Sequence, residues 1–248
     1  MRQRLAMFTS ARVGLGRSGA SLPLPEVLRL SEAHAAARDA VHAALDVAAL
    51  AADLSPLGLP VLTVRSAASD RQTYLKRPDL GRQLDEESRQ VFRSDGSQEV
   101  VFVIADGLSA FAIQNHAARF LSVLLPSLDG WKVAPLVIAT QARVALGDEI
   151  GERLGAKLCV VLIGERPGLS SPDSMGAYLT YQPAVGRTDA ERNCISNIHG
   201  SGLSYEVAAT RLLFLLNESR RRKLSGVGLK ENSGELLLRA GEAALPAE

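Results

Sequence analysis

The chain is poor in the residue types that mark specialised classes of protein. Only 2 of its 248 residues are cysteines and only 4% are aromatic. Cys159 and Cys194 form neither a disulfide framework nor a metal-ligand spacing, which favours a reducing cytoplasm as the compartment. The formal net charge is only +1, and charges of both signs are interspersed. Nucleic acid and anionic membrane surfaces are therefore not expected as partners.

Long hydrophobic runs are also missing. No uninterrupted apolar stretch approaches the roughly 20 residues needed to cross a bilayer, and the residues before Arg12 lack the apolar core of a signal peptide. We therefore expect no membrane segment. Hydrophobic residues nevertheless make up 46% of the chain, which is sufficient for a sizeable core. The composition predicts a globular, cytoplasmic protein.

Apolar runs alternate with helical patterns after residue 95. Each run is bounded by glycine, proline or polar residues, as is typical of buried strands in a parallel sheet. Strands are expected at 100–105, 135–139 and 158–163, and helices at 109–125, 148–154 and 204–224. This order predicts an α/β fold, with a Rossmann-like, mostly parallel sheet over residues 96–231.

Residues 1–95 are predicted to form an α-helical N-terminal region. Apolar residues at helical spacing from Glu26 to Leu54 indicate one long helix or two shorter ones. A further helix is expected over 81–91, with Asp79 as its cap after Pro78. At the other end of the chain, residues 232–248 have the composition of a flexible tail.

Polar residues follow the expected strands and suggest a ligand-binding edge. Asp106 and Ser109 follow the first strand, Gln141 to Val144 follow the second, and Glu165 follows the third. A polar loop at 193–200 adds Cys194 and His199. Open α/β sheets bind ligands beyond the carboxyl ends of their strands. Asp106 or Ser109 can also cap the helix that follows, which is the interpretation we favour.

Two functions other than ligand binding at this edge remain open. Gly14 to Gly19 has the glycine spacing of a dinucleotide fingerprint, but the preceding strand and the later acidic residue of that motif are missing. A dinucleotide-dependent oxidoreductase is therefore the alternative function, and a noncatalytic scaffold is a third. No phosphate-binding Walker loop, zinc cluster or nucleophile elbow is present, so we expect no metal ligands.

Five ordered segments carry a resemblance to a known family. The chain resembles the small subunit of ethanolamine ammonia-lyase from about Ala11 to Leu224. The matching segments are YLKRPDLGR (74–82), DGLS (106–109), IGERLGAK (150–157), GERPGL (164–169) and CISNIH (194–199).

The resemblance implies a place in a two-subunit enzyme. The family pairs this subunit with a larger TIM-barrel subunit that holds ethanolamine, and adenosylcobalamin lies between the two. The reaction converts ethanolamine to acetaldehyde and ammonia by a radical route. The resemblance thus implies a hetero-oligomer of large and small subunits, in which this chain binds the cofactor and carries no catalytic residue of its own. The family is found in the cytoplasm and, as a second possibility, inside a bacterial microcompartment.

By its motifs, the resemblance implies that three residues of this chain contact the cobalamin, namely Val144, Glu165 and Cys194. Without the family, Val144 and Cys194 would be interpreted as packing residues, whereas a carboxylate beside a buried strand end must find partners, either Arg166 or ligand donors. His199 lies in the matching loop and fits either a cofactor contact or a tether for the loop.

The histidines bear on how the cobalamin is held. None of His34, His42, His116 and His199 follows an aspartate by two positions, which is the pattern of proteins that replace the nucleotide base on cobalt. We therefore expect the cofactor to bind with its own dimethylbenzimidazole on the cobalt.

Overall fold

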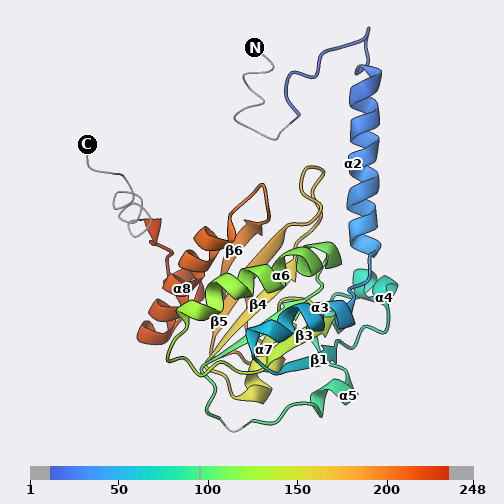
Figure 1. The fold of residues 1–248 in the computed structure, drawn as a ribbon. Helices are drawn as coiled ribbons and strands as arrows, with labels where there is room; N and C mark the ends of the chain where they lie inside the picture. Colours follow the sequence, from blue (N-terminus) through green and yellow to red (C-terminus); the bar gives the residue numbers. More distant parts are fainter. Residues whose placement is uncertain (1–11, 95, 235–248) are drawn as a thin grey trace, which may run out of the picture.

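The computed structural model describes residues 12–94 and 96–234. Its centre is a six-stranded sheet in the order β1-β3-β2-β4-β5-β6 (Figure 1). The first four strands in this order pair in parallel, whereas β5 is antiparallel to both β4 and β6. The predicted α/β class is confirmed with a mostly parallel, mixed sheet, but a Rossmann-like fold is not confirmed. The strands are β1 (Val61–Arg65), β2 (Val100–Ala105), β3 (Leu136–Thr140), β4 (Leu158–Gly164), β5 (Met175–Tyr181) and β6 (Arg192–Ile198).

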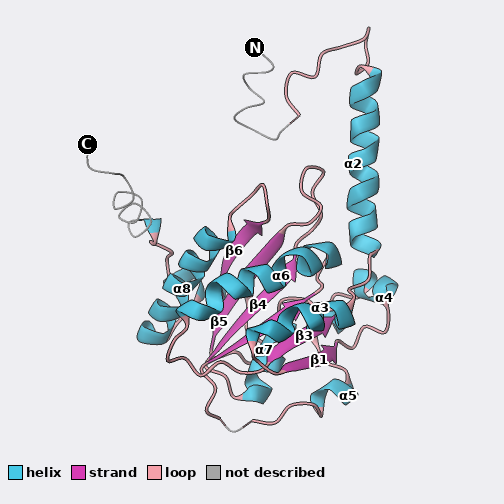
Figure 2. Ribbon diagram, in the orientation of Figure 1, coloured by secondary structure: helices cyan, strands magenta, loops and turns pink. Residues whose placement is uncertain are grey.

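Helices pack on both faces of this sheet, but they leave part of β6 exposed (Figure 2). Alternate residues of β2 show the division, because Phe102 and Ile104 join a buried cluster with α3, α6 and α8, whereas Val101 and Val103 join a second cluster with α7. All residues of β2 are buried, as expected for a central strand between two helical layers. The helices are α2 (Leu24–His42), α3 (Val47–Leu54), α4 (Arg71–Lys76), α5 (Glu86–Arg89), α6 (Ala110–Leu124), α7 (Leu146–Leu154) and α8 (Tyr205–Arg222).

The strands and helices predicted after residue 95 lie within two residues of those observed. The strands at 100–105 and 158–163 correspond to β2 and β4, and 135–139 is displaced by one residue from β3. The helices at 109–125, 148–154 and 204–224 correspond to α6, α7 and α8. The predicted bounds are accurate because long apolar runs and clear helical periods both reflect burial directly.

The helix predicted over 81–91 is wrong. Only α5 is α-helical there, and its cap is Asp85, whose carboxylate accepts a hydrogen bond from the Ser88 amide. Asp79 makes no capping bond and instead pairs with Arg77, with their side-chain atoms 2.6 Å apart. The backbone before α5 is extended because tertiary hydrogen bonds hold it, including one from the Leu84 amide to Glu149 at 2.9 Å.

The loop predicted at 193–200 is also wrong over most of its length. Residues Arg192–Ile198 form β6, and Cys194 lies opposite Tyr178 of β5. Ile195 and Ile198 face the helix-covered core, whereas Cys194 and Ser196 are exposed. A register irregularity between β5 and β6 interrupts the strict alternation that marks a strand in sequence.

The N-terminal region contains the two shorter helices that were one of the two expectations for 26–54. α2 ends before Asp46, whose carboxylate caps α3 by accepting a hydrogen bond from the Ala49 amide. β1 also belongs to this region and pairs with β3, so the sheet draws strands from both sides of residue 95. The division into 1–95 and 96–231 stays a prediction, and residues 235–248 of the predicted tail lie outside the described residues.

Residues 12–23 show an isolated bridge between Ser18 and Ser21 but no named strand. The strand that a dinucleotide fingerprint needs before its glycines is thus missing from the part of this segment that the structure describes. No single helix in the described ranges is long and apolar enough to cross a membrane. α2 and the following helical stretch to Leu57 would together have the necessary length and composition, but the two are bent by 83° relative to each other.

Candidate functional site

The end of β4 is fixed by close backbone packing. A Cβ atom added at Gly164 would lie 2.0 Å from the carbonyl oxygen of Ser109, so only glycine fits there. The Leu108 amide donates to the Gly164 carbonyl at 2.9 Å. The turn after β2 therefore packs directly on the end of β4 and sets the direction in which the chain continues to Glu165.

Glu165 is the first of the three residues expected to contact a cofactor. Its Oε2 accepts hydrogen bonds from the Ser174 hydroxyl at 2.6 Å and from the Asn197 amide at 3.3 Å. Its Oε1 lies over Gly176, where an added Cβ would approach it to 2.9 Å. No hydrogen bond from the described residues reaches Oε1, and the partner expected at Arg166 makes no ion pair with it. Half of this carboxylate thus keeps its capacity to accept hydrogen bonds.

Cys194 lies beside Glu165 on the same face of the sheet. Tyr178 of β5 is the register partner of Cys194, and their side chains interact. Although Cys194 is exposed as a residue, desolvation of its sulfur and the charge of Glu165 raise the pKa of the thiol, against the opposing effect of Tyr178. Burial and the interaction with Cys194 raise the pKa of Tyr178. Both groups are therefore neutral at physiological pH.

Val144 occupies the turn before α7, on this same side of the sheet. It is half-buried, packs against the cluster between α7 and the sheet, and lines a cavity of about 680 Å³ that also includes Arg143 and Arg192. α7 approaches the sheet closely because Gly147 has no side chain, and a Cβ there would lie 2.3 Å from Val161. Val161 is the register partner of Tyr178 on β5. Val144 therefore lies on the same side of the sheet as Glu165 and Cys194, but neither of those two residues lines this cavity.

Buried Asp106 supports the turn that carries Val144. Its two carboxylate oxygens accept hydrogen bonds from the Gln141 and Ala142 amides at 2.8 Å and 3.0 Å. Burial raises the pKa of this carboxyl group, against the effect of those amides and of Arg71. Ser109, not Asp106, caps α6 by accepting a hydrogen bond from the Ala112 amide. One of the two alternatives for the cap is thus confirmed, and Asp106 instead holds two strand ends together.

The loop from Glu165 to Ser174 is attached to the helices above it. The Ser109 hydroxyl donates to the carbonyl of Pro172 at 2.8 Å. Buried His116 lies 3.2 Å from Asp173 through Nε2 and 2.7 Å from the Tyr205 hydroxyl through Nδ1. α6 and α8 therefore hold the loop next to Ser174, the residue that donates to Glu165.

His199 is engaged within its own loop. Its Nε2 lies 2.9 Å from the Asn197 side-chain oxygen, and its Nδ1 lies 3.5 Å from the Ser201 hydroxyl. The residue is buried. These contacts correspond to the tether, one of the two roles that the sequence left open.

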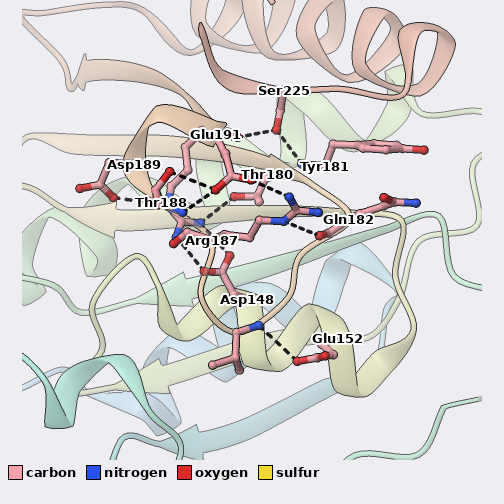
Figure 3. Close-up of polar contacts among 12 residues, drawn as sticks. Asp148, Glu152, Thr180, Tyr181, Gln182, Arg187, Thr188, Asp189, Glu191 and Ser225 are labelled. Carbon is pink, nitrogen blue, oxygen red and sulfur yellow. Dashed lines mark hydrogen bonds and ion pairs between the residues drawn. The ribbon is translucent and has the colours of Figure 1, made fainter. Parts of the chain in front are cut away.

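A buried ion-pair cluster lies next to this face, under the hairpin between β5 and β6 (Figure 3). Arg192 donates to both carboxylate oxygens of Asp148 at 2.7 Å, to the Thr180 hydroxyl at 2.9 Å and to the Arg187 carbonyl at 2.9 Å. The side chains of Arg192 and Asp148 are each only 2% exposed. The Arg192–Asp148 pair joins α7 to the start of β6. Cys194 and Ser196, further along β6, are exposed.

Tyr178, Ser174 and Gly176 were not singled out from the sequence. Their signal is the alternation in MGAYLTY over β5, in which Met175, Ala177 and Leu179 face the core and the residues between them face the site. Within the described ranges, no three His, Cys, Asp or Glu residues are grouped so that they could hold a metal ion.

Comparisons with known proteins agree on one family. The family model "Ethanolamine ammonia-lyase light chain (EutC)" matches residues 1–230. The ethanolamine ammonia-lyase small subunit of Pseudomonas syringae pv. tomato is 51% identical over 97% of this chain and 86% of its own, and that of Azotobacter vinelandii is 53% identical over 93% and 88%. That of Ralstonia nicotianae is 52% identical over 96% of this chain and 91% of its own. The chain belongs to the ethanolamine ammonia-lyase light chain family.

Proposed function

We propose that this chain binds adenosylcobalamin on the face formed by Val144, Glu165 and Cys194, and that it acts with a large subunit to convert ethanolamine to acetaldehyde and ammonia. One observation carries the proposal. Glu165 is held rigidly through Oε2, while Oε1 accepts no hydrogen bond from the described residues and lies over a glycine on an uncovered sheet face. An accessible carboxylate oxygen on a side chain that is already held in place can accept a hydrogen bond from a ligand.

The chemistry of this face fits a corrinoid. A corrin ring is broad and apolar and has amide side chains at its rim, so it suits apolar contacts together with a small number of hydrogen-bond acceptors. Glu165 Oε1 is a carboxylate oxygen that can accept a hydrogen bond from an amide N–H. Val144 and Cys194 offer apolar contact at two points of the same face, and the Cys194 thiol is neutral there because its pKa is raised.

Hydrogen bonds from neighbouring residues hold the side chains and turns of this face in one arrangement. Ser174 and Asn197 orient the Glu165 carboxylate, and Asp106 holds the turn before Val144. Binding groups that are fixed before the ligand arrives lose less conformational entropy on binding. We infer no catalytic residue in this chain: its own residues bind and orient, and the large subunit holds the substrate.

When bound, adenosylcobalamin supplies homolysis of its cobalt–carbon bond, the step that starts radical chemistry. The chain provides one wall of the cofactor site, and a large subunit must provide the other. The names of the relatives, each a small subunit, support such a partner. Assembly as a hetero-oligomer, in the cytoplasm or inside a microcompartment, is part of the same proposal.

A spectral titration tests the proposal. Purified chain is mixed with the matching large subunit, and adenosylcobalamin is added while its visible spectrum and ammonia release from ethanolamine are followed. Glu165→Gln keeps the shape of the side chain but removes its charge, and we expect its cofactor Kd to rise about tenfold, or about 1.4 kcal/mol. The wild-type spectrum should show the benzimidazole base on cobalt.

Glu87→Gln is the matched control, because Glu87 is an exposed carboxylate on α5. It should bind cofactor as the wild type does, and both variants should melt at the wild-type temperature. Wild-type affinity in Glu165→Gln, or no spectral change with the complete pair of subunits, would overturn the proposal. Binding of a nicotinamide dinucleotide in place of cobalamin would favour the oxidoreductase.

A further inference from the structure

α2 has almost no packing of its own. It is 19 residues long, yet among its described residues only Ala40 is buried. In Figure 1 it rises from the region of α4 and leaves the body of the protein. Most helices in proteins gain their stability from packing of an apolar face rather than from intrinsic propensity. A helix with one buried residue therefore has an unused packing surface.

The unpacked surface carries large apolar side chains toward the start of α2. Leu24 and Leu28 lie one helical turn apart and are 67% and 60% exposed, and Val27 beside them is 41% exposed. Leu22 and Val13, in the segment before the helix, are 39% and 37% exposed. A cluster of exposed large apolar side chains marks a protein interaction site.

Two contacts fix where this surface lies. At the base of α2, Arg71 donates from Nε to the carbonyl of Val41 at 2.6 Å and from Nη1 to the carbonyl of Gly107 at 2.8 Å, in the turn after β2. At the far end, Arg12 donates to the carbonyl of Leu169 at 3.0 Å, within the loop that begins at Glu165. The segment therefore stands at the carboxyl edge of the sheet, beside the candidate cofactor site.

We propose that residues 12–42, which we name the N-terminal arm, are a docking surface for the large subunit, and that Leu24, Val27 and Leu28 form its contact patch. This inference rests on the proposed function, because a cofactor shared between two subunits requires the large subunit to cover the carboxyl edge. The arm begins at that edge and touches the Glu165 loop, so one continuous partner surface reaches both.

The size of the arm agrees with this partner. A helix of 19 residues is roughly 28 Å long at about 1.5 Å per residue. A stable interface buries about 800 Å² on each partner, which is more than one face of such a helix supplies. The arm and the carboxyl edge together provide the larger area, whereas a second copy of this chain seated on the arm alone would not.

A double variant tests the docking. Leu24→Glu with Leu28→Glu is co-expressed with the large subunit, and heteromer formation is measured by size-exclusion chromatography with light scattering. We expect the apparent Kd for assembly to rise at least tenfold, because two charges are placed in an apolar contact. Helix content and melting temperature should stay unchanged, since both side chains are mostly exposed.

Val227→Glu is the control, because Val227 is 82% exposed and follows Gly226, which packs against Ala190 at the opposite, amino edge of β4. It should assemble normally. A photoreactive residue placed at position 28 should crosslink to the large subunit, and one at position 227 should not.

The outcomes separate this inference from the proposed function. Normal assembly of the double variant together with no crosslink at position 28 overturns the docking, whatever the cofactor result. Crosslinks between two copies of this chain, or binding of the arm to lipid vesicles in place of the large subunit, overturn it as well. If assembly depends on the arm but no cobalamin binds, the docking stands and the proposed function fails.

Discussion

Asp148 and Glu165 are two carboxylates on the same side of one sheet with opposite degrees of pairing. Both oxygens of Asp148 are bonded to buried Arg192 at 2.7 Å. Glu165 is bonded through one oxygen, and its other oxygen lies over Gly176 on an uncovered face. Both oxygens of Asp148 are thus occupied by a structural contact, whereas Glu165 can still accept a hydrogen bond through one oxygen. Pairing, rather than charge or residue type, therefore separates a carboxylate used by the fold from one that can still accept a hydrogen bond.

The difference follows from what covers each part of the face. α7 lies over Cys159 and Val161, and Asp148 on that helix reaches Arg192 at the start of β6. Glu191 closes the hairpin by accepting from the Thr188 amide at 2.7 Å and from Arg187 at 2.6 Å. Beyond α7, Tyr178 is half-buried and Cys194 is exposed. We expect substitutions in the covered part to change stability and substitutions in the uncovered part to change binding.

The largest expected effect comes from breaking the buried pair. Arg192→Leu leaves Asp148 buried without its partner, and we expect the free energy of unfolding to fall by about 3–5 kcal/mol, measured by urea denaturation. The double variant Asp148→Leu with Arg192→Met should recover much of that loss, because it removes both charges. Arg77→Ala is the control, since the Arg77–Asp79 pair is exposed. A small effect of Arg192→Leu would show that the cluster is not structural.

Two glycine substitutions sharpen the comparison at a smaller scale. An added Cβ at Gly164 meets the backbone carbonyl of Ser109 at 2.0 Å, whereas one at Gly176 meets the end of the Glu165 side chain at 2.9 Å. Gly164→Ala should lower the free energy of unfolding by about 3 kcal/mol. Gly176→Ala should cost less than about 1 kcal/mol but should weaken cofactor binding, because it displaces the carboxylate. Equal loss of stability in both variants would argue against a binding role for this face.

The smallest expected effect is a pH dependence at the hairpin. The hydrogen bond from the Thr188 backbone, with the side chains of Arg187 and Thr188, lowers the pKa of Glu191 from 4.5 to about 2. Because the folded-state pKa lies below the unfolded value, this stabilisation is fully present above about pH 4.5 and is lost as the pH falls toward 2. Glu191→Gln should flatten the acid limb of stability against pH. Its cofactor affinity at neutral pH should match the wild type.

Particular residues show which elements of the fold can be predicted from the sequence and which cannot. β2 and β4 were predicted closely because their residues are apolar without interruption, and Ser109 was one of the two residues proposed as the cap of α6. β6 was missed because polar residues on its uncovered side interrupt the apolar alternation. The helix at 81–91 was wrong because Glu149, 65 residues away, captures the Leu84 amide. Local patterns do not report such distant hydrogen bonds.

The candidate site divides in the same way. Val144, Glu165 and Cys194 were proposed from motif resemblance, and their functional roles stay predictions. Tyr178 and Gly176 were not proposed, because nothing local marks a tyrosine or a glycine within a strand as part of a binding face. Only the pairing of β5 with β4 and β6 places them between Glu165 and Cys194.

The sequence by itself determined the α/β class, the central strands and the family, because burial patterns and ordered motifs consist of residues that are close together in the sequence. Only the tertiary structure decided which polar groups are paired and which are left over. The pairing of Asp148 with Arg192, 44 residues apart, and the free oxygen of Glu165 both depend on strand order and on where α7 lies. Hydrogen bonding is short-ranged in space but not in sequence, so this distinction requires the folded chain.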